Sequence, residues 1–163
     1  MKRGLLRWPD RRLTEVAVAV EEVTDDTQRI WQDMIDTMEA MPGIGLAAPQ
    51  IGIGLRLAIV DASTERGSAV RMANPVLIET EGPLVKGWEA SPNLPGIEAQ
   101  VTRHAIAVVS YIDAESRPMQ DRFTGLWARS VQHQIDHLDG LLFIDRMSRT
   151  KRDMVLRKFR KLS

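Results

Sequence analysis

Apolar residues recur at helical spacing over 24–43, where they lie three or four positions apart. Thr24 or Asp25 can cap the start of this segment, and Pro42 with Gly43 ends it. The pattern predicts a helix whose core-facing stripe consists of Ile30, Met34, Met38 and Met41.

A second helical pattern covers 124–138, with Thr124 at the N-cap position and Gly140 as the stop. Three segments between the two helices are rich in β-branched residues and predict strands at 55–61, 70–79 and 104–113. Gly82 and Pro83 are expected to interrupt the chain after the second strand. Strands enclosed by two unlike helices, without alternation of strand and helix, favour an α+β fold. At 163 residues the chain is expected to form a single domain, 1–163.

Composition narrows the possible chemistry. The chain has 22 basic and 22 acidic residues, so no overall charge favours binding to DNA. No run of about 18 apolar residues and no signal sequence is present, which predicts a cytoplasmic protein that does not enter a membrane. The absence of cysteine excludes disulfides, thiolate ligands of a metal and cysteine nucleophiles.

Two segments carry candidate chemistry. In "GIGLAAPQIG" (43–52), the glycines allow a ligand to approach the backbone, and Gln50 offers an amide that can donate to a carbonyl or an oxyanion. In "QHQIDH" (132–137), His133 and His137 lie four residues apart on one face of the second helix. Two imidazoles at this spacing can bind one cation, although two polar histidines in a helix would look the same.

Together with "GWEASPNLPG" (87–96), these segments resemble the peptide deformylase family. The family's motifs are Gly-x-Gly-Leu-Ala-Ala-x-Gln, Glu-Gly-Cys-Leu-Ser and His-Glu-x-x-His, in this order. The resemblance extends over nearly the whole chain and implies small mixed or antiparallel sheets around a central helix that carries both histidines. It also implies hydrolysis of the formyl group of N-formylmethionine at a divalent metal, which is iron, zinc or nickel.

The resemblance assigns further residues. The substrate cleft would be lined by Gly43, Ile44, Gly45, Leu46, Leu126, Arg129 and Ser130. Ser130 is more polar than a methionine pocket would favour. Glu89 and Arg103 would form a structural ion pair, and Gln50, Ser91 and Gln134 would occupy the catalytic positions.

Three positions differ from the family's motifs. Ser91 replaces the cysteine ligand, Gln134 replaces the glutamate, and Pro92 removes the backbone N–H that would stabilise the oxyanion. We therefore expect a degraded metal and catalytic site, a pseudoenzyme with a weakly bound divalent metal on His133 and His137 or none. Its retained cleft would bind a peptide N-terminus or a small ligand.

Two alternatives remain open. One is a hydrolase that performs altered chemistry in the same cleft, with Ser91 as a nucleophile beside a histidine or with a weakly held metal. The other is an active peptide deformylase with an unusual site.

The last segment, 146–163, predicts a basic amphipathic helix, with Val155, Phe159 and Leu162 on its apolar face. It is either a solvated terminal helix packed on the body of the protein or a contact to ribosomal RNA.

Overall fold

The computed structural model describes residues 1–41 and 43–163. Pro42, which was expected to help end the first helix, lies outside the described residues. The sheet consists of β1 (Gly45–Ala47), β2 (Leu57–Val60), β3 (Val70–Ala90), β4 (Glu98–Ile112) and β5 (Pro118–Thr124). The helices are α1 (Asp25–Ala40), α2 (Gly125–Leu138) and α3 (Arg149–Leu162), with short 3-10 turns at 11–14, 48–51 and 143–146.

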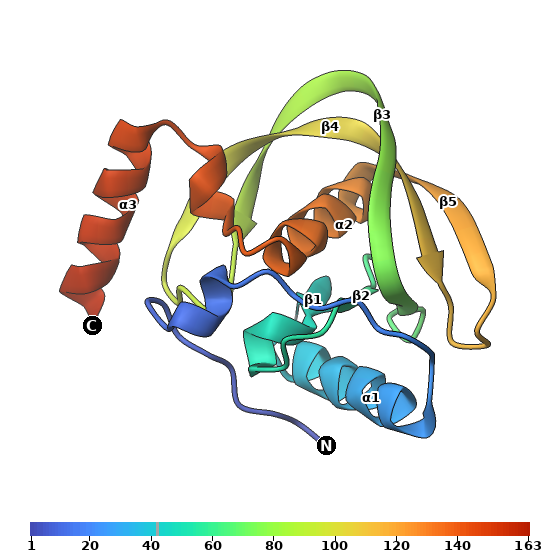
Figure 1. Ribbon diagram of the computed structural model, residues 1–163. Helices are drawn as coiled ribbons and strands as arrows, with labels where there is room; N and C mark the ends of the chain where they lie inside the picture. The colour runs from blue at the N-terminus through green and yellow to red at the C-terminus, as the bar shows by residue number, and fades with distance from the viewer. Residues whose placement is uncertain (42) are drawn as a thin grey trace.

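The strands form one antiparallel sheet in the order β1-β2-β3-β4-β5, which confirms the α+β class. Figure 1 shows the long β3 and β4 curving over α2, which lies at the centre of the molecule as expected. On the other side of α2, β1 and β2 separate it from α1. The helix with the two histidines is therefore enclosed between the sheet and the N-terminal half of the chain.

Both predicted helices are present, with bounds close to those expected. The side chain of Thr24 accepts a hydrogen bond from the backbone N–H of Thr27, which caps α1. Thr124 is the N-cap residue of α2, although its side chain makes no capping hydrogen bond. Gly140 has a φ of 77°, and a Cβ there would lie 2.6 Å from the carbonyl oxygen of Thr14. The glycine therefore both ends α2 and lets the N-terminal segment pass close to it.

The expected break at Gly82 and Pro83 is wrong, because β3 continues through both residues to Ala90. The pairing of β3 with β4 shifts register between Glu81 and Leu84, and Gly82 adopts a φ of 74°. A bulge of this kind accommodates a glycine and a proline without ending the strand, and it bends the strand. Beyond the bulge, residues 88–91 line the cleft described below.

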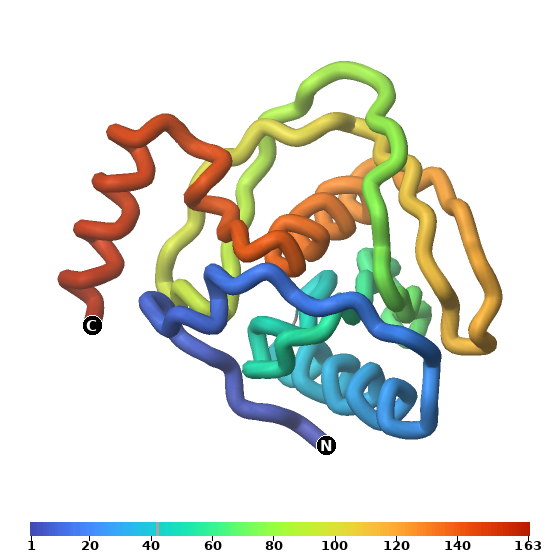
Figure 2. Tube along the Cα trace, in the orientation of Figure 1, coloured from blue at the N-terminus to red at the C-terminus, as the bar shows by residue number. Residues whose placement is uncertain are grey.

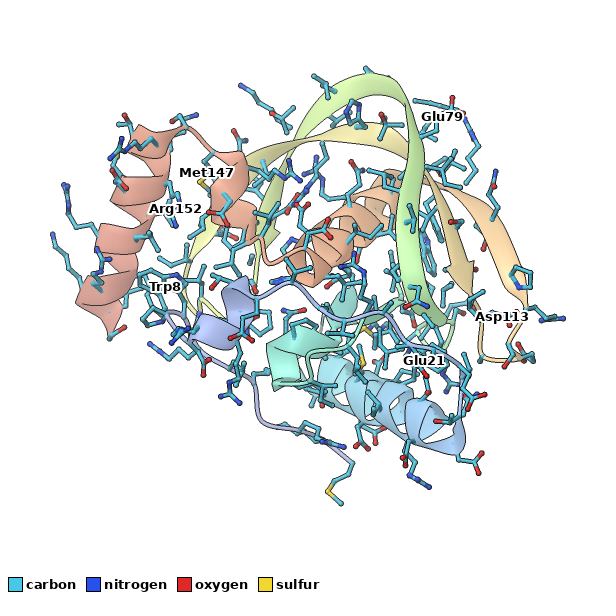
Figure 3. The ribbon with its side chains drawn as sticks, in the orientation of Figure 1. Trp8, Glu21, Glu79, Asp113, Met147 and Arg152 are labelled. Atoms are coloured by element: carbon cyan, nitrogen blue, oxygen red, sulfur yellow. The ribbon has the colours of Figure 1, made fainter. Side chains whose placement is uncertain are left out.

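Three groups of buried side chains hold α1, α2 and α3 in place. The first joins α1 to β1 and β2 and the second joins α2 to the sheet. The third joins α3 to 94–101 and 142–144. The predicted basic helix is confirmed as α3, and its buried residues are Leu156 and Phe159. The ring of Phe159 packs edge-on against Trp8, and Figure 3 shows Trp8 beside α3.

The N-terminal segment is hydrogen-bonded to two segments that carry residues of the site described below. Figure 2 shows this segment running beside α1 before it turns toward the centre of the molecule. The backbone N–H groups of Leu6 and Trp8 donate to the carbonyl oxygens of Gln50 and Asn93 at 2.9 Å each. Two segments that are distant in sequence, 48–51 and 91–94, are thereby fixed next to each other.

Among residues 1–41 and 43–163, no helix combines the length and the apolar character that a membrane span requires.

Candidate active site

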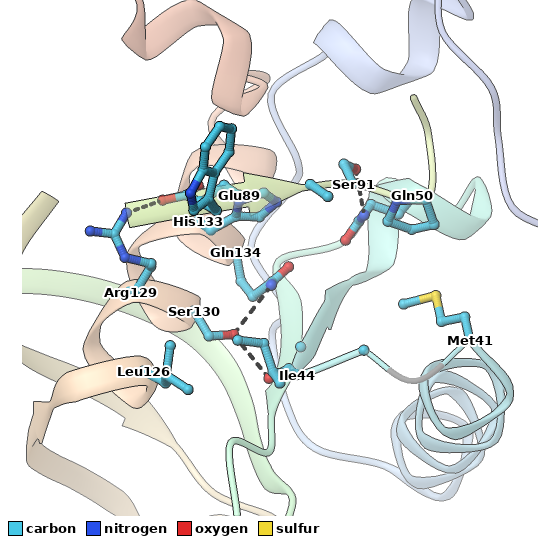
Figure 4. A pocket seen from close by; sticks show the side chains of 15 residues that line it. Met41, Ile44, Gln50, Glu89, Ser91, Leu126, Arg129, Ser130, His133 and Gln134 are labelled. Atoms are coloured by element: carbon cyan, nitrogen blue, oxygen red, sulfur yellow. Dashed lines mark hydrogen bonds and ion pairs between the residues drawn. The ribbon is translucent and has the colours of Figure 1, made fainter. Parts of the chain in front are cut away.

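A cleft of about 410 Å³ opens between α2, β1, the end of β3 and the segment that follows α1. Figure 4 shows α2 contributing Leu126, Arg129, Ser130, His133 and Gln134, with Gln50 and Ser91 at the opposite end. The remaining lining residues are Met41, Gly43, Ile44, Gly45, Trp88, Glu89, Ala90 and Pro92. The three sequence motifs therefore meet in one cavity.

Not every expected cleft residue lines the cavity. Leu46 is fully buried in the core that α1 forms with the sheet, so it supports the cleft wall without facing it. Trp88 and Met41 do line the cleft, and neither was selected from the sequence. Trp88 is 63% exposed on β3. A large aromatic residue directly before the Glu89 motif was a signal that could have identified it.

His133 and His137 face each other with their Nε2 atoms 3.1 Å apart. The Nδ1 atom of His133 lies 2.8 Å from Oε1 of Glu89, which is a carboxylate acceptor. His133 therefore carries its proton on Nδ1 and presents a lone pair at Nε2. His137 is 1% exposed, and its burial lowers its pKa well below the usual value, with a further contribution from His133.

Glu89 is held by four hydrogen bonds. Arg103 donates to both of its oxygens at 2.9 and 2.8 Å, Arg129 donates to Oε2 at 2.7 Å, and His133 donates to Oε1. Burial alone would raise the pKa of Glu89, but the hydrogen bonds from Arg103 and His133 outweigh it and hold the pKa well below its usual range. The expected pair of Glu89 and Arg103 is present, and it orients His133.

Gln134 projects a free acceptor into the cleft. The hydroxyl of Ser130 donates to the carbonyl oxygen of Ile44 at 2.9 Å, so its oxygen is left to accept from Nε2 of Gln134 at 3.5 Å. This fixes the orientation of the amide (Figure 4). In the described part of the chain, Oε1 of Gln134 is buried without a hydrogen-bond partner. A buried orphan acceptor lining a cavity is a position where a ligand or water donor is needed.

Gln50 and Ser91 are tied together through Asn93. The amide of Gln50 accepts from the backbone N–H of Ala47 and donates to Oδ1 of Asn93, both at 2.8 Å. Its second N–H faces the hydroxyl oxygen of Ser91 at 3.5 Å. Ser91 in turn donates to Oδ1 of Asn93 at 3.1 Å.

Within the described residues, no histidine nitrogen lies within hydrogen-bond distance of the Ser91 hydroxyl, and the two Nε2 atoms that face inward pair with each other. The hypothesis of Ser91 as a histidine-activated nucleophile therefore lacks the geometry that it requires.

Comparison with known proteins identifies this arrangement. The model of the polypeptide deformylase family matches residues 2–153. This chain belongs to the peptide deformylase family. It is 43% identical to a peptide deformylase of Xylella fastidiosa over 96% of this chain and 94% of that protein. A peptide deformylase of Brucella suis is 38% identical over 99% and 93% of the two chains. The crystal structure of a peptide deformylase from Legionella pneumophila superimposes with a TM-score of 0.93 at 36% identity, covering 99% of this chain and 95% of that one.

These relatives overturn the expectation of a degraded pseudoenzyme. Proteins about 40% identical to this chain over nearly its whole length carry the name peptide deformylase, so the expectation of an inactive relative is wrong. The expectation rested on the combined changes at Ser91, Pro92 and Gln134. The described contacts show that Glu89 still orients His133 and that Gln134 still presents an oxygen to the cleft. The active-deformylase alternative is the better supported one.

The peptide deformylase family is typically metal-dependent, and the two histidines fit a metal. Two nitrogens bonded to one cation at about 2.0–2.1 Å lie roughly 3 Å apart, and the Nε2 atoms here are 3.1 Å apart. Glu89 fixes His133 in the tautomer that presents a lone pair, as carboxylate partners of ligating histidines do. Among residues 1–41 and 43–163, no cluster of three or more His, Cys, Asp or Glu could hold a metal. Among the described residues, these two imidazoles are therefore the side chains that could offer ligands to a metal here, with Ser91 as a neutral side chain in the same cleft.

Gly45 is required by this packing. A Cβ at position 45 would lie 2.5 Å from Nε2 of Gln134 and would also overlap Oγ of Ser130. We expect Gly45→Ala to push both side chains off position and to cost about 1–3 kcal/mol of stability. Urea unfolding measures this cost. Gly54→Ala is the matched control, because a Cβ at position 54 meets no described atom within 4 Å. Equal stability of the two variants would contradict the predicted overlap.

Proposed function

We propose that this protein is an active, cytoplasmic peptide deformylase, which hydrolyses the formyl group of N-formyl peptides to formate and a free amino terminus. The observation that carries the proposal is the convergence of three groups on one cleft. These are His133, whose Nε2 atom lies 3.1 Å from that of the buried His137, the unpartnered oxygen of Gln134, and the amide of Gln50; His137 itself does not line the cleft. The names of the relatives in Xylella and Brucella support the same activity.

His133 and His137 would hold a divalent metal, which is iron, zinc or nickel by resemblance to the family. Imidazole suits each of these ions. Such an ion polarises the formyl oxygen and lowers the pKa of a nearby water.

The chain's own residues position the reacting groups. Oε1 of Gln134 accepts a hydrogen bond from the attacking water and fixes its direction. The second N–H of Gln50, which makes only a long 3.5 Å contact with the hydroxyl oxygen of Ser91, would donate to the oxyanion that forms on the formyl group. Because Pro92 has no backbone N–H, these side chains take over the oxyanion contact at this end of the cleft. An amide cannot take up a proton, so the water's proton reaches the leaving nitrogen through solvent in the open cleft.

Formate release from formyl-Met-Ala-Ser by the metal-loaded protein tests the proposal. We expect turnover that a chelator abolishes and that His133→Ala removes. His104→Ala is the matched control, because this third histidine is exposed on β4 and only its backbone carbonyl is used, by Gln132. Formate release no faster than that of the free peptide, with iron, zinc and nickel each supplied, would disprove the activity.

We further propose that α3 contacts ribosomal RNA. Its exposed basic residues are Arg149, Lys151, Arg157, Lys158, Arg160 and Lys161. A helix face of this charge binds phosphate with a strong dependence on salt. Deleting α3 would open the core around Phe159, so charge reversal is the better test.

The protein with Arg157→Glu and Lys158→Glu is expected to lose salt-sensitive co-sedimentation with ribosomes. The same reversal at the exposed Lys86 on β3 should have no effect. Unchanged sedimentation of the α3 variant would exclude this contact.

A further inference from the structure

Arg129 is an unusual residue for the wall of a cleft that receives an apolar side chain. It lies on α2, and Figure 4 shows its guanidinium paired with Glu89 on β3. Nη1 donates to Oε2 of Glu89 at 2.7 Å and to the carbonyl oxygen of Val101 at 2.9 Å. Nη2 donates to the carbonyl oxygen of Val85 at 2.7 Å. These contacts fix a cationic group in the cleft wall.

Gly87 provides the space for this group. A Cβ at position 87 would lie 2.8 Å from both Cζ and Nε of Arg129. The guanidinium therefore lies directly against the backbone of β3, and only glycine at position 87 permits that position. Gly87 and Arg129 act as a pair, because the arginine can occupy the wall only where the strand has no side chain.

Two of the N–H donors of the guanidinium have no partner within the described residues. Arginine has five N–H donors in a fixed planar fork. Glu89, Val101 and Val85 take three of them, and within the described residues Nε and the second hydrogen of Nη2 have no partner. These two donors lie on adjacent nitrogens, which is the arrangement that binds a carboxylate through both of its oxygens.

The charges around the cleft also favour an anion. Arg129 belongs to a connected group that contains three arginines, Arg103, Arg129 and Arg146, and two carboxylates, Glu89 and Asp136. The group therefore has one more arginine than carboxylates. Glu89 is the only carboxylate among the described lining residues, and its oxygens are occupied by Arg103, Arg129 and His133. The Arg129 side chain is 11% exposed, and a largely buried positive charge is stabilised by a negative ligand.

We infer that Arg129 makes the cleft select N-formyl peptides whose first residue carries a carboxylate side chain. This inference rests on the proposed deformylase function and names its substrate class. Ser130 lies next to Arg129 in the wall and adds a polar surface rather than an apolar one.

The decisive comparison uses two substrates of the same shape, formyl-Glu-Ala-Ser and formyl-Gln-Ala-Ser. We expect kcat/KM to favour the glutamate peptide on the order of tenfold, as a charge-assisted hydrogen bond to a partly buried group provides. In Arg129→Leu the ratio should fall to one or below. Because the readout is a ratio within each variant, a general loss of activity or stability does not affect it.

A second variant, Gly87→Ala, displaces the guanidinium of Arg129 without substituting Arg129 itself. Gly87→Ala places a methyl group where the guanidinium now lies, so it too should reduce the preference for glutamate. Gly54→Ala serves as its control, with an unchanged ratio. A wild-type ratio near one, or a preference that survives both Arg129→Leu and Gly87→Ala, would overturn the inference.

A measurement of peptide binding distinguishes a failure of this inference from a failure of the proposed function. The affinities of the unformylated peptides Glu-Ala-Ser and Gln-Ala-Ser, measured by calorimetry, require no turnover. If the wild-type protein prefers the glutamate peptide and Arg129→Leu does not, the inference stands even when no formate is released. If formate is released but neither ratio depends on Arg129, the proposed function stands and the inference fails.

Discussion

Gln134→Glu is expected to raise the turnover of formyl-Met-Ala-Ser by about 10²–10⁴-fold, the usual contribution of a positioned general base. The amide of Gln134 already points its oxygen into the cleft without a partner. A carboxylate of nearly the same shape would keep this hydrogen bond to the attacking water and would also take up its proton. The gain should appear in kcat, because the substrate contacts of the cleft are unchanged.

The pH dependence provides a second readout of the same change. Rates in Gln134→Glu should fall on the acid side as the new carboxyl group is protonated, whereas the unmodified protein has no such group at this position. Gln134→Met removes the acceptor and should lower turnover. Gln120→Glu, at an exposed position on β5, controls for the added charge. A Gln134→Glu variant no faster than the unmodified protein would show that Gln134 does not face the reacting water.

The local sequence was sufficient for α1, α2 and α3, because each combines an apolar stripe with identifiable ends. Thr24 caps α1 and Gly140 follows α2, as expected from residues that act within one turn. The local sequence was not sufficient to predict β1 and β5, which have three and seven residues. Strands this short owe their conformation to pairing with β2 and β4, and a pattern read along one segment does not contain that pairing.

The site, like the fold, could be predicted only in part. The resemblance of the motifs to those of the family predicted that Gln50, Ser91 and Gln134 share one site, and the structure brings them together in the cleft. The partners of Arg129 could not be predicted, because Val85 and Val101 are backbone acceptors on strands that the chain reaches only after folding. The role of Gly87 depends on the same contact, since a glycine in a strand has no local signal for what lies against it.

Arg103→Met is expected to destabilise the protein by about 3–5 kcal/mol, the cost of leaving buried charges without their partner. Arg103 donates to both oxygens of Glu89 and, at 2.6 Å, to Oδ2 of Asp136. All three side chains are less than 10% exposed. Without the guanidinium, two carboxylates would face each other in a region from which water is excluded. Urea unfolding measures the loss as a lower midpoint with little change in slope.

Arg122→Met is the control for this prediction. Arg122 also pairs with a carboxylate across two strands, Glu81 at 3.1 Å, but both side chains are more than one third exposed. Exposed pairs of this kind contribute about 1 kcal/mol or less. Destabilisation of Arg103→Met by no more than that of Arg122→Met would show that the buried pair is not needed for stability.

The other cationic partners of Glu89 and Asp136 determine how much stability Arg103→Met should lose within the range of about 3–5 kcal/mol. Glu89 would keep Arg129, and Asp136 would keep Arg146, so neither carboxylate would be left without any cation. The loss should therefore lie near the lower end of the range. Combining Arg103→Met with Glu89→Gln removes one of the two charges, and the double variant should recover part of the lost stability. It should not recover function, because Glu89 is also the group that orients His133. The substitution at position 89 would then restore stability without restoring activity, which separates the two roles of this carboxylate.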